Sequence, residues 1–154
     1  MIGGMNMNKY MKLAIEQAKD GIHAGHGGPF GCVIVKDDQV VGEGHNEVIE
    51  QNDPTCHGEI MAIHSACKTL GTFDLTGCEL YTTAEPCPMC LGAILWANIR
   101  KVYYGCNISD TDAIGFRDKE FFARSRDDIS EELDRSECLE VFQEYQKIEN
   151  KKLY

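Results

Sequence analysis

The chain has 154 residues, a formal net charge of −10, and ordinary proportions of hydrophobic (43%) and charged (26%) residues. A chain of this length forms one domain around one core, and its composition excludes the disordered and fibrous classes. We therefore expect a single domain over residues 1–154, with residues 1–6 flexible.

Apolar residues nowhere form the run of roughly 18 that a membrane helix needs. The first 20 residues have the pattern of a polar amphipathic helix and lack the apolar core of a signal peptide. These features predict a cytoplasmic protein without a membrane-bound segment.

The first half of the chain predicts a helix followed by a β-hairpin. Residues 7–24 place apolar side chains at near-helical spacing and end in a loop rich in glycine. Residues 30–35 and 40–44 are short apolar runs that flank a polar Lys-Asp-Asp-Gln turn, which is typical of two antiparallel strands.

Strands and helices then alternate. Residues 47–54 form a polar loop that leads into a helix over residues 56–70. Strands are expected at residues 79–83 and 101–105, with a helix over residues 86–98 between them. This alternation favours parallel pairing of these two strands, and the whole pattern indicates an α/β layered domain.

The C-terminal part has weaker periodicity. Residues 107–129 are expected to be irregular, and residues 129–154 helical with a break or bend near Ser136. Residues 127–144 carry eight acidic side chains and the single basic Arg135. Such a segment repels a phosphate backbone, although charge runs are usually solvated helix faces. It therefore argues against a nucleic-acid partner without excluding one.

Two short segments carry the chemistry of the chain. The first reads His-x-Glu and contains His57 and Glu59. The second is a Cys-x-x-Cys pair formed by Cys87 and Cys90, and it begins 28 residues after Glu59. One imidazole and two thiolates suit Zn²⁺ and leave a fourth tetrahedral position for a bound water or hydroxide. We therefore predict one zinc ion per chain, bound by His57, Cys87 and Cys90.

The spacing assigns Glu59 a different role. It lies two positions after His57, which is poor spacing for two ligands on one helical face but lets the carboxylate reach a water on the metal. Zinc lowers the pKa of bound water toward about 7, so a nearby carboxylate can take its proton at neutral pH. Glu59 is thus the candidate general base and acid.

Simpler interpretations of the same residues remain open. A Cys-x-x-Cys pair is also typical of redox proteins and of structural zinc sites, which normally have four protein ligands. Cys56 could be such a fourth ligand. His64 is expected to be a core or surface residue, and the remaining cysteines are expected to lie in the core as free thiols.

The His-x-Glu and Pro-Cys-x-x-Cys segments together resemble the signature of zinc-dependent base deaminases. Over nearly its whole length the chain resembles the cytidine deaminase superfamily, and within it the small bacterial guanine deaminases. Further motifs carry the resemblance: Pro29-Phe30-Gly31, Gly44-His45-Asn46, Asp53-Pro54-Thr55 and the run from Glu85 to Ala93. The tRNA adenosine deaminases share the zinc motif and the Gly-His-Asn turn, so these residues leave the substrate open.

The C-terminal segments resemble the guanine-specific branch. They are Gly115-Phe116-Arg117-Asp118 and the final residues Asn150 to Tyr154. By this resemblance Asn46 hydrogen-bonds the base, Phe30 and Phe116 stack on it, Asp118 is a second proton carrier and Tyr154 closes the pocket. Without the resemblance, the aromatic residues would be read as packing, Asp118 as a solvated charge and Asn46 as a turn residue.

The resemblance also implies the architecture and the assembly. It implies a three-layer α/β/α fold with a five-stranded mixed sheet, and a homodimer in which residues 107–154 are exchanged between subunits. Two positions depart from the family pattern. Gly58, which we include among the substrate-binding candidates, and Arg117 stand where alanine and an acidic residue are common, and Arg117 could alter the orientation or pKa of Asp118.

The sequence therefore predicts a zinc-dependent hydrolase that deaminates a purine base, with guanine as the expected substrate and xanthine and ammonia as products. The alternative enzyme acts on adenosine in tRNA, on another nucleoside, or on another aminopurine or aminotriazine. The alternative from another class is a zinc-stabilised scaffold or redox dithiol protein, which would have no need of Glu59.

Overall fold

The computed structural model describes residues 6–154, apart from the side chain of Asp127. The flexibility expected of residues 1–6 lies outside the described residues except at Asn6. The chain forms two compact units, of which the first ends at Phe122 and the second begins at Ala123.

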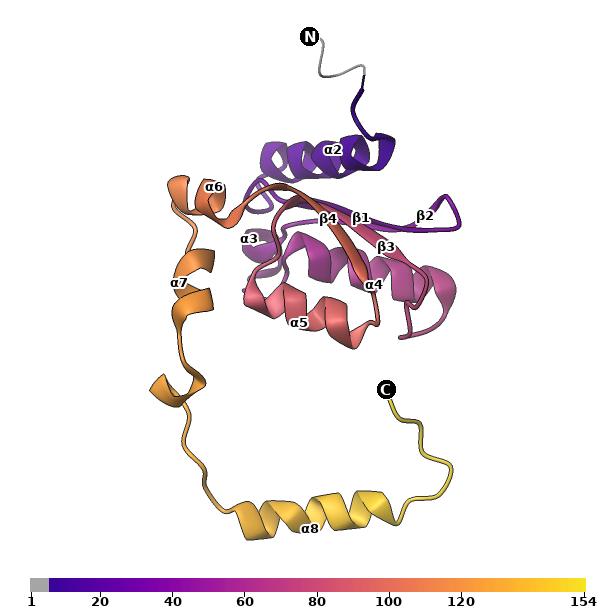
Figure 1. Ribbon diagram of the computed structural model, residues 1–154, viewed down its shortest axis with the longest axis vertical. Coiled ribbons are helices and arrows are strands. Elements are labelled where there is room, and N and C mark those ends of the chain that lie inside the picture. The colour runs from indigo at the N-terminus through magenta and orange to yellow at the C-terminus, as the bar shows by residue number, and fades with distance from the viewer. Residues whose placement is uncertain (1–5) are drawn as a thin grey trace. The chain divides into compact units, whose positions relative to one another are not determined.

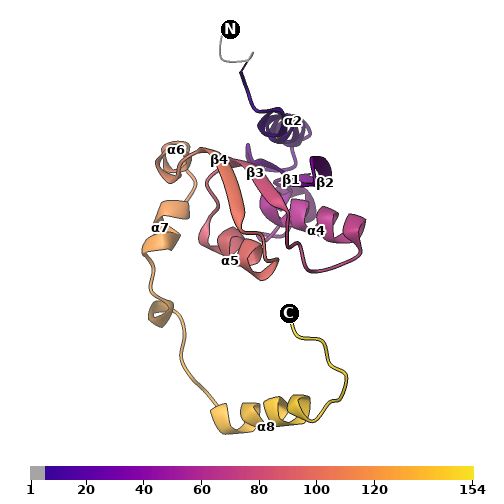
Figure 2. The same cartoon turned by 45° about the vertical axis from the view of Figure 1, so that its right-hand side comes forward.

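Four strands form one mixed sheet in the order β2-β1-β3-β4 (Figures 1 and 2). Strand β1 pairs antiparallel with both β2 and β3, whereas β3 and β4 are parallel. The predicted hairpin and the predicted parallel pair are thus confirmed. The strands are β1 (Gly31–Lys36), β2 (Gln39–His45), β3 (Glu79–Ala84) and β4 (Lys101–Cys106).

The hairpin turn follows from its two aspartates. Asp37 and Asp38 have φ angles of 50° and 61°, and Lys36 pairs directly with Gln39 across the turn. Two consecutive residues with positive φ are typical of the tight turn whose twist matches that of antiparallel strands, and aspartate tolerates this conformation.

Helices cover both faces of the sheet (Figures 1 and 2). Helix α2 (Lys9–His23) packs on one face, and α4 (Gly58–Leu70) and α5 (Pro88–Trp96) pack on the other. The larger core lies between the sheet and helices α4 and α5, and it includes Ile34, Leu80 and Ile94. These layers are the α/β arrangement that the alternating pattern predicts.

The fifth strand expected from the resemblance is wrong for the described residues, because the chain turns into helix after β4. Asn107 accepts a hydrogen bond from the N–H of Asp110, and the Asp110 carboxylate accepts one from the N–H of Asn107. This capping box starts α6 (Ile108–Ala113). Helix α7 (Asp118–Ala123) follows, so residues 107–129 are also less irregular than expected.

Two further local predictions are wrong. The loop expected at residues 47–54 contains a single helical turn, α3 (Val48–Gln51). In the second unit a 3-10 turn (Arg126–Asp128) precedes α8 (Arg135–Gln146), and Ser136 lies inside that helix rather than at a break. The interruption is at Asp134, which has a left-handed conformation with φ of 53°.

The remaining cysteines are all free, but they do not all lie in the core. Cys32, Cys56 and Cys78 are buried as expected, whereas Cys106 and Cys138 are exposed. None of the helices in the described part of the chain is long and apolar enough to cross a membrane.

Gly31 fixes the contact of α2 with the sheet. A Cβ atom at this position would lie 2.0 Å from the Ala14 carbonyl oxygen and 2.4 Å from the Ala18 nitrogen, both in the backbone of α2. We expect Gly31→Ala to lower the free energy of unfolding by about 3 kcal/mol, because the helix must move off β1. Urea denaturation measures this loss.

Gly92→Ala is the matched control. Nothing lies within 4 Å of the added Cβ in α5, so this change should raise stability by about 0.5–1 kcal/mol through helix propensity. Equal effects of the two changes would contradict the packing role of Gly31.

Candidate active site

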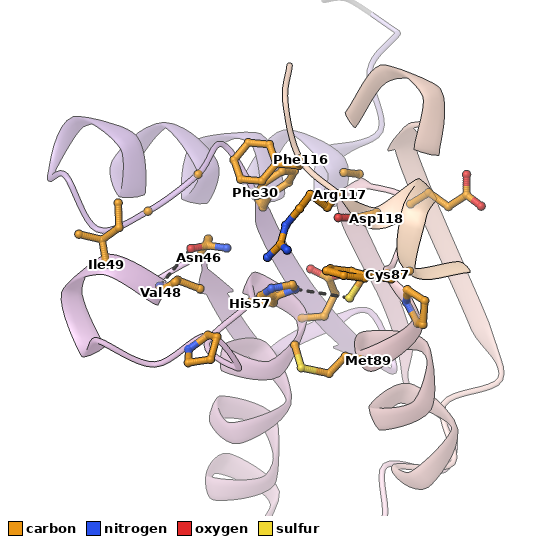
Figure 3. Close-up of a pocket in the computed structure, with 18 residues that line it drawn as sticks. Phe30, Asn46, Val48, Ile49, His57, Cys87, Met89, Phe116, Arg117 and Asp118 are labelled. Atoms are coloured by element: carbon orange, nitrogen blue, oxygen red, sulfur yellow. Dashed lines mark hydrogen bonds between the residues drawn. The ribbon is translucent and has the colours of Figure 1, made fainter. Parts of the chain in front are cut away.

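The predicted zinc ligands lie at the N-termini of two neighbouring helices (Figure 3). His57 is the N-cap residue of α4, and Cys87 is the N-cap residue of α5, followed by Pro88 in the first turn. The Cys87 sulfur accepts a hydrogen bond from the N–H of Cys90, at 3.5 Å. Because both helix dipoles point their positive ends here, thiolates are favoured at this place.

The distances between these side chains fit a zinc ion. Both sulfur atoms lie 3.5 Å from Nδ1 of His57. Tetrahedral zinc, with bonds of about 2.3 Å to sulfur and about 2.0 Å to nitrogen, holds such atoms about 3.6 Å apart. Cys56 is not part of this group, and burial and the charge of Asp53 raise the pKa of its thiol. The group that fits a zinc ion is therefore His57, Cys87 and Cys90.

The pKa values of these three side chains depend strongly on one another. The hydrogen bond with Cys90 and the neighbouring His57 together lower the pKa of Cys87 to about 4, against the effect of burial. The same contact raises the pKa of Cys90, and burial and the charge of Glu59 add to the rise. The hydrogen bond with Cys87 raises the pKa of His57. A metal ion would replace the shared protons, so acid should weaken its binding.

Glu59 lies in the first turn of α4 and is only 6% exposed. Burial raises the pKa of its carboxyl to about 7; its own backbone N–H opposes the rise, the charge of Cys87 adds to it, and His57 opposes it. The Cys90 thiol also acts to lower this pKa. A buried carboxyl beside the proposed ligands, and outside the ligand set, fits a proton carrier.

These side chains open onto a cavity of about 670 Å³, which is the size of a small-molecule site. His57, Glu59 and Cys87 lie in its wall, together with Phe30, Asn46, Phe116, Arg117 and Asp118 (Figure 3). The structure thus brings together residues from five separate parts of the chain that the sequence predicted to act at one site.

Two aromatic rings form part of the wall. Phe30 and Phe116 meet edge to face, with ring centroids 4.9 Å apart and an interplanar angle of 82°. A Cβ atom on Gly28 would lie 2.8 Å from each of these rings. The two phenylalanines therefore pack on each other and on a glycine, and still border the cavity.

Asn46 is buried and is held in the cavity wall by two hydrogen bonds. Its N–H donates to the Phe30 carbonyl at 2.9 Å, and its Oδ1 accepts from the N–H of Val48 at 3.0 Å. Asn46 thus makes the local turn bond expected of an asparagine after a strand. Its Nδ2 makes no hydrogen bond to another described residue, so this amide is the polar group it offers to a ligand.

Asp118 begins α7 and is partly buried. Burial raises the pKa of its carboxyl and the charge of Cys87 adds to the rise, whereas His57 and the backbone N–H of Asp118 oppose it. The neighbouring Arg117 lies with its guanidinium 4.9 Å from the ring centroid of Phe121. Its charge is not among the causes of the shift at Asp118.

No role at the cavity follows from the structure for two of the predicted residues. Gly58 is a buried residue at the start of α4, where an added Cβ would lie 3.2 Å from the Phe30 carbonyl oxygen. Tyr154 belongs to the second unit and is 81% exposed. Their roles toward a substrate stay predictions.

The cavity also has lining residues that sequence analysis missed, among them Gly27, Val48, Ile49 and Met89. Gly27 had a signal, because it lies in the glycine-rich segment before Pro29. Val48 and Ile49 had none, since a pair of apolar residues in a polar segment resembles any surface turn.

Comparison with known proteins identifies the class of the protein. Residues 5–106 match the cytidine and deoxycytidylate deaminase zinc-binding region, which includes all three proposed ligands and Glu59. The chain belongs to this deaminase family. It is 45% identical to guanine deaminase from Bacillus subtilis, over 97% of this chain and the full length of that protein.

Solved structures show the same relationship. The crystal structure of the Bacillus subtilis guanine deaminase superposes with a TM-score of 0.89 at 42% identity, covering 96% of this chain and 99% of that one. A guanine deaminase from Nitrosomonas europaea gives a TM-score of 0.67 at 34% identity, over 71% and 63% of the two chains. A tRNA-specific adenosine deaminase from Aquifex aeolicus is 42% identical over 65% of this chain and 66% of its own.

Loss of one thiolate should abolish tight metal binding. We expect Cys90→Ser to reduce the zinc content of this site from one ion per chain to near zero after dialysis against a weak chelator, because hydroxyl oxygen is a poor substitute for thiolate. Elemental analysis of the purified protein measures this. Cys106→Ser, which removes an exposed thiol outside the group, should keep its zinc. A zinc content of the Cys90 variant equal to that of the wild type would show that the ligand set is different.

Proposed function

We propose that the protein is a zinc-dependent guanine deaminase, which converts guanine and water to xanthine and ammonia. The observation that carries this proposal is the full-length similarity to a guanine deaminase, combined with a His-Cys-Cys group and a buried glutamate in one cavity. A structural zinc protein or a redox dithiol protein would not need the carboxyl of Glu59 at this position. A cytoplasmic location remains our prediction.

Each of the chain's groups has a chemical task in this reaction. His57, Cys87 and Cys90 hold the zinc ion, which when bound makes a water acidic enough to attack at neutral pH. Glu59 takes a proton from the attacking water and delivers it to a ring nitrogen of the base. The carbon that bore the amino group gains the oxygen, its bond to nitrogen breaks, and the amine leaves as ammonia after a further proton transfer. We assign that transfer to Glu59 or Asp118.

The remaining residues hold the base. Phe30 and Phe116 offer ring surfaces to a flat heterocycle. The Nδ2 amide of Asn46 donates a hydrogen bond to an acceptor on the base, while its Oδ1 stays engaged with Val48. Such contacts fix the amino-bearing carbon near the metal, and correct positioning is a major part of catalysis.

A free base is favoured over tRNA as the substrate. The similarity to the guanine deaminase extends over 97% of the chain, whereas that to the Aquifex tRNA deaminase extends over 65%. The acidic segment of residues 127–144 also disfavours an RNA backbone near the C-terminus.

We further propose a homodimer in which residues 107–154 are exchanged between subunits. Helix α8 has no buried residue, and its Val141 and Phe142 are 63% and 69% exposed. In the first unit, Leu95 of α5 is 64% exposed and Tyr104 of the edge strand β4 is 49% exposed. Apolar surface of this extent is typical of surfaces that associate with another subunit.

A substrate panel tests the proposed activity. The zinc-loaded protein should release ammonia from guanine with a far higher kcat/KM than from adenine, cytosine, adenosine, guanosine or a tRNA anticodon stem-loop. Glu59→Gln should lower kcat on guanine by about 10²- to 10⁴-fold, the usual contribution of a general acid and base.

The exposed Glu16→Gln, on the surface of α2, provides the charge-matched control and should keep full activity. No turnover of guanine by the zinc-loaded protein would refute the proposed substrate. Unchanged turnover in Glu59→Gln with zinc still bound would refute the proposed proton carrier.

A mixing experiment tests the exchanged dimer. We expect Tyr154→Ala to lower kcat/KM by at least about tenfold, since it removes the group that closes the pocket. Co-expressed Tyr154→Ala and Glu59→Gln chains should then regain about one quarter of wild-type activity, because half of the dimers are mixed and each has one intact site. Activity equal to the mean of the two separate variants would indicate that Tyr154 acts in its own subunit and is not exchanged.

A further inference from the structure

A second group of potential metal ligands lies apart from the His-Cys-Cys group. His26 follows α2, His45 is the last residue of β2, and Glu47 immediately precedes α3. One ligand atom of each residue lies within 4.8 Å of the other two, and all three residues are partly buried. We name these residues the His-His-Glu cluster.

The two imidazoles approach each other through nitrogen. Nδ1 of His26 lies 2.8 Å from Nε2 of His45, and the ring centroids are 5.1 Å apart. With Zn–N bonds of about 2.0 Å, a tetrahedral ion holds two imidazole centroids about 5.2 Å apart and their nitrogens about 3.3 Å apart. The rings are therefore already at the spacing of a metal site, and a small pivot of each ring would open the gap between the nitrogens.

The ring of His45 is also oriented as a metal-bound histidine is. Its second nitrogen, Nδ1, lies 3.0 Å from Oε1 of Gln17, to which it donates its proton. This bond leaves the lone pair on Nε2, the atom that faces His26. Metal-binding histidines usually have such a partner on the other ring nitrogen, which fixes the tautomer and the ring plane.

The fold makes room for this ring through Gly21 in α2. A Cβ atom at Gly21 would lie 2.7 Å from Cδ2 of His45. The glycine and Gln17 belong to one helix, so α2 both admits the imidazole and holds its far nitrogen. The arrangement therefore has the second layer of contacts that a chance pair of surface histidines lacks.

We propose that the His-His-Glu cluster binds a second divalent transition-metal ion, separate from the ion of the catalytic group. Two imidazole nitrogens and one carboxylate oxygen suit Zn²⁺, Ni²⁺ or Cu²⁺, whereas Mg²⁺ and Ca²⁺ prefer oxygen ligands alone. The inference does not depend on the proposed substrate, because it rests on residues outside the catalytic group.

The protons balance without an additional reactant. In the metal-free protein His26 donates its Nδ1 proton to Nε2 of His45. When the ion binds both nitrogens, that proton leaves Nδ1, and the neutral ring of His26 carries its proton on Nε2 instead. Glu47 binds as a carboxylate, and must give up its contact with Nε2 of Gln51 if it uses the same oxygen.

The position of the cluster gives the ion a structural effect on the cavity. The carbonyl of His26 accepts hydrogen bonds from the N–H groups of Ile49 and Glu50, both at 3.0 Å. Gly27 and Asn46, the chain neighbours of His26 and His45, line the cavity. An ion at the cluster would thus join three chain segments that form one wall of the cavity, and would stiffen that wall.

Metal counting tests the proposal. The full-length protein is stripped of metal, dialysed to equilibrium against excess Zn²⁺ and analysed for zinc per chain. We expect two ions in the wild type, one in His45→Gln and one in Glu47→Gln. The exposed His64→Gln, outside both clusters, is the matched control and should bind two. Using both cluster variants keeps the test valid if one of them fails to fold.

Two further measurements identify the site. Co²⁺ titration should give thiolate charge-transfer absorption from one equivalent and none from the other, and His45→Gln should lose only the equivalent without that absorption. Gln17→Ala should weaken this equivalent by about 10- to 100-fold in calorimetry and leave the other unchanged. One zinc per chain in the wild type, or equal loss in His64→Gln and His45→Gln, would overturn the proposal.

Discussion

The site depends on the meeting of two helix N-termini. Helices α4 and α5 begin side by side below the sheet, and their N-cap residues are His57 and Cys87. Because unpaired N–H groups and positive dipole ends face the same point, thiolates are stabilised there. The 3.5 Å distances from both sulfurs to the imidazole follow from this meeting. Glu59 is placed by the same helix start, in the first turn of α4 and away from solvent.

The part of the cavity wall that contains Phe30 and Asn46 is made of loops that pack closely rather than of regular structure. Phe30 immediately precedes β1, and its carbonyl accepts a hydrogen bond from the N–H of Asn46 at 2.9 Å. That bond joins the loop after α2 to the end of β2. The cavity is therefore formed where three chain connections come together, which is the usual location of binding residues on an α/β scaffold.

The sequence was informative where a residue has a strict chemical or conformational requirement. The hairpin, the parallel strands and the grouping of His57, Cys87 and Cys90 were predicted because alternation, Asp-Asp turns and thiolate spacing each have few structural explanations. The fifth strand was carried over from a resemblance, and the capping pair Asn107 and Asp110 in the chain itself indicates a helix there. Ile49 could not be predicted, because its place in the cavity wall depends on packing between segments distant in the sequence.

The glycines beside the aromatic pair restrict how this cavity can diverge. At Gly27 an added Cβ would lie 2.1 Å from Oδ1 of Asn46, and at Gly28 it would meet both phenylalanine rings at 2.8 Å. Any larger residue at either position therefore narrows the space for a ligand, whatever its polarity. Acceptance of a bulkier ligand is therefore expected to arise from a smaller side chain at Phe116, which follows Gly115 with its φ of 97°. Substitutions that alter the size of the accepted ligand are thus expected at Phe116, whereas Gly27 and Gly28 resist change.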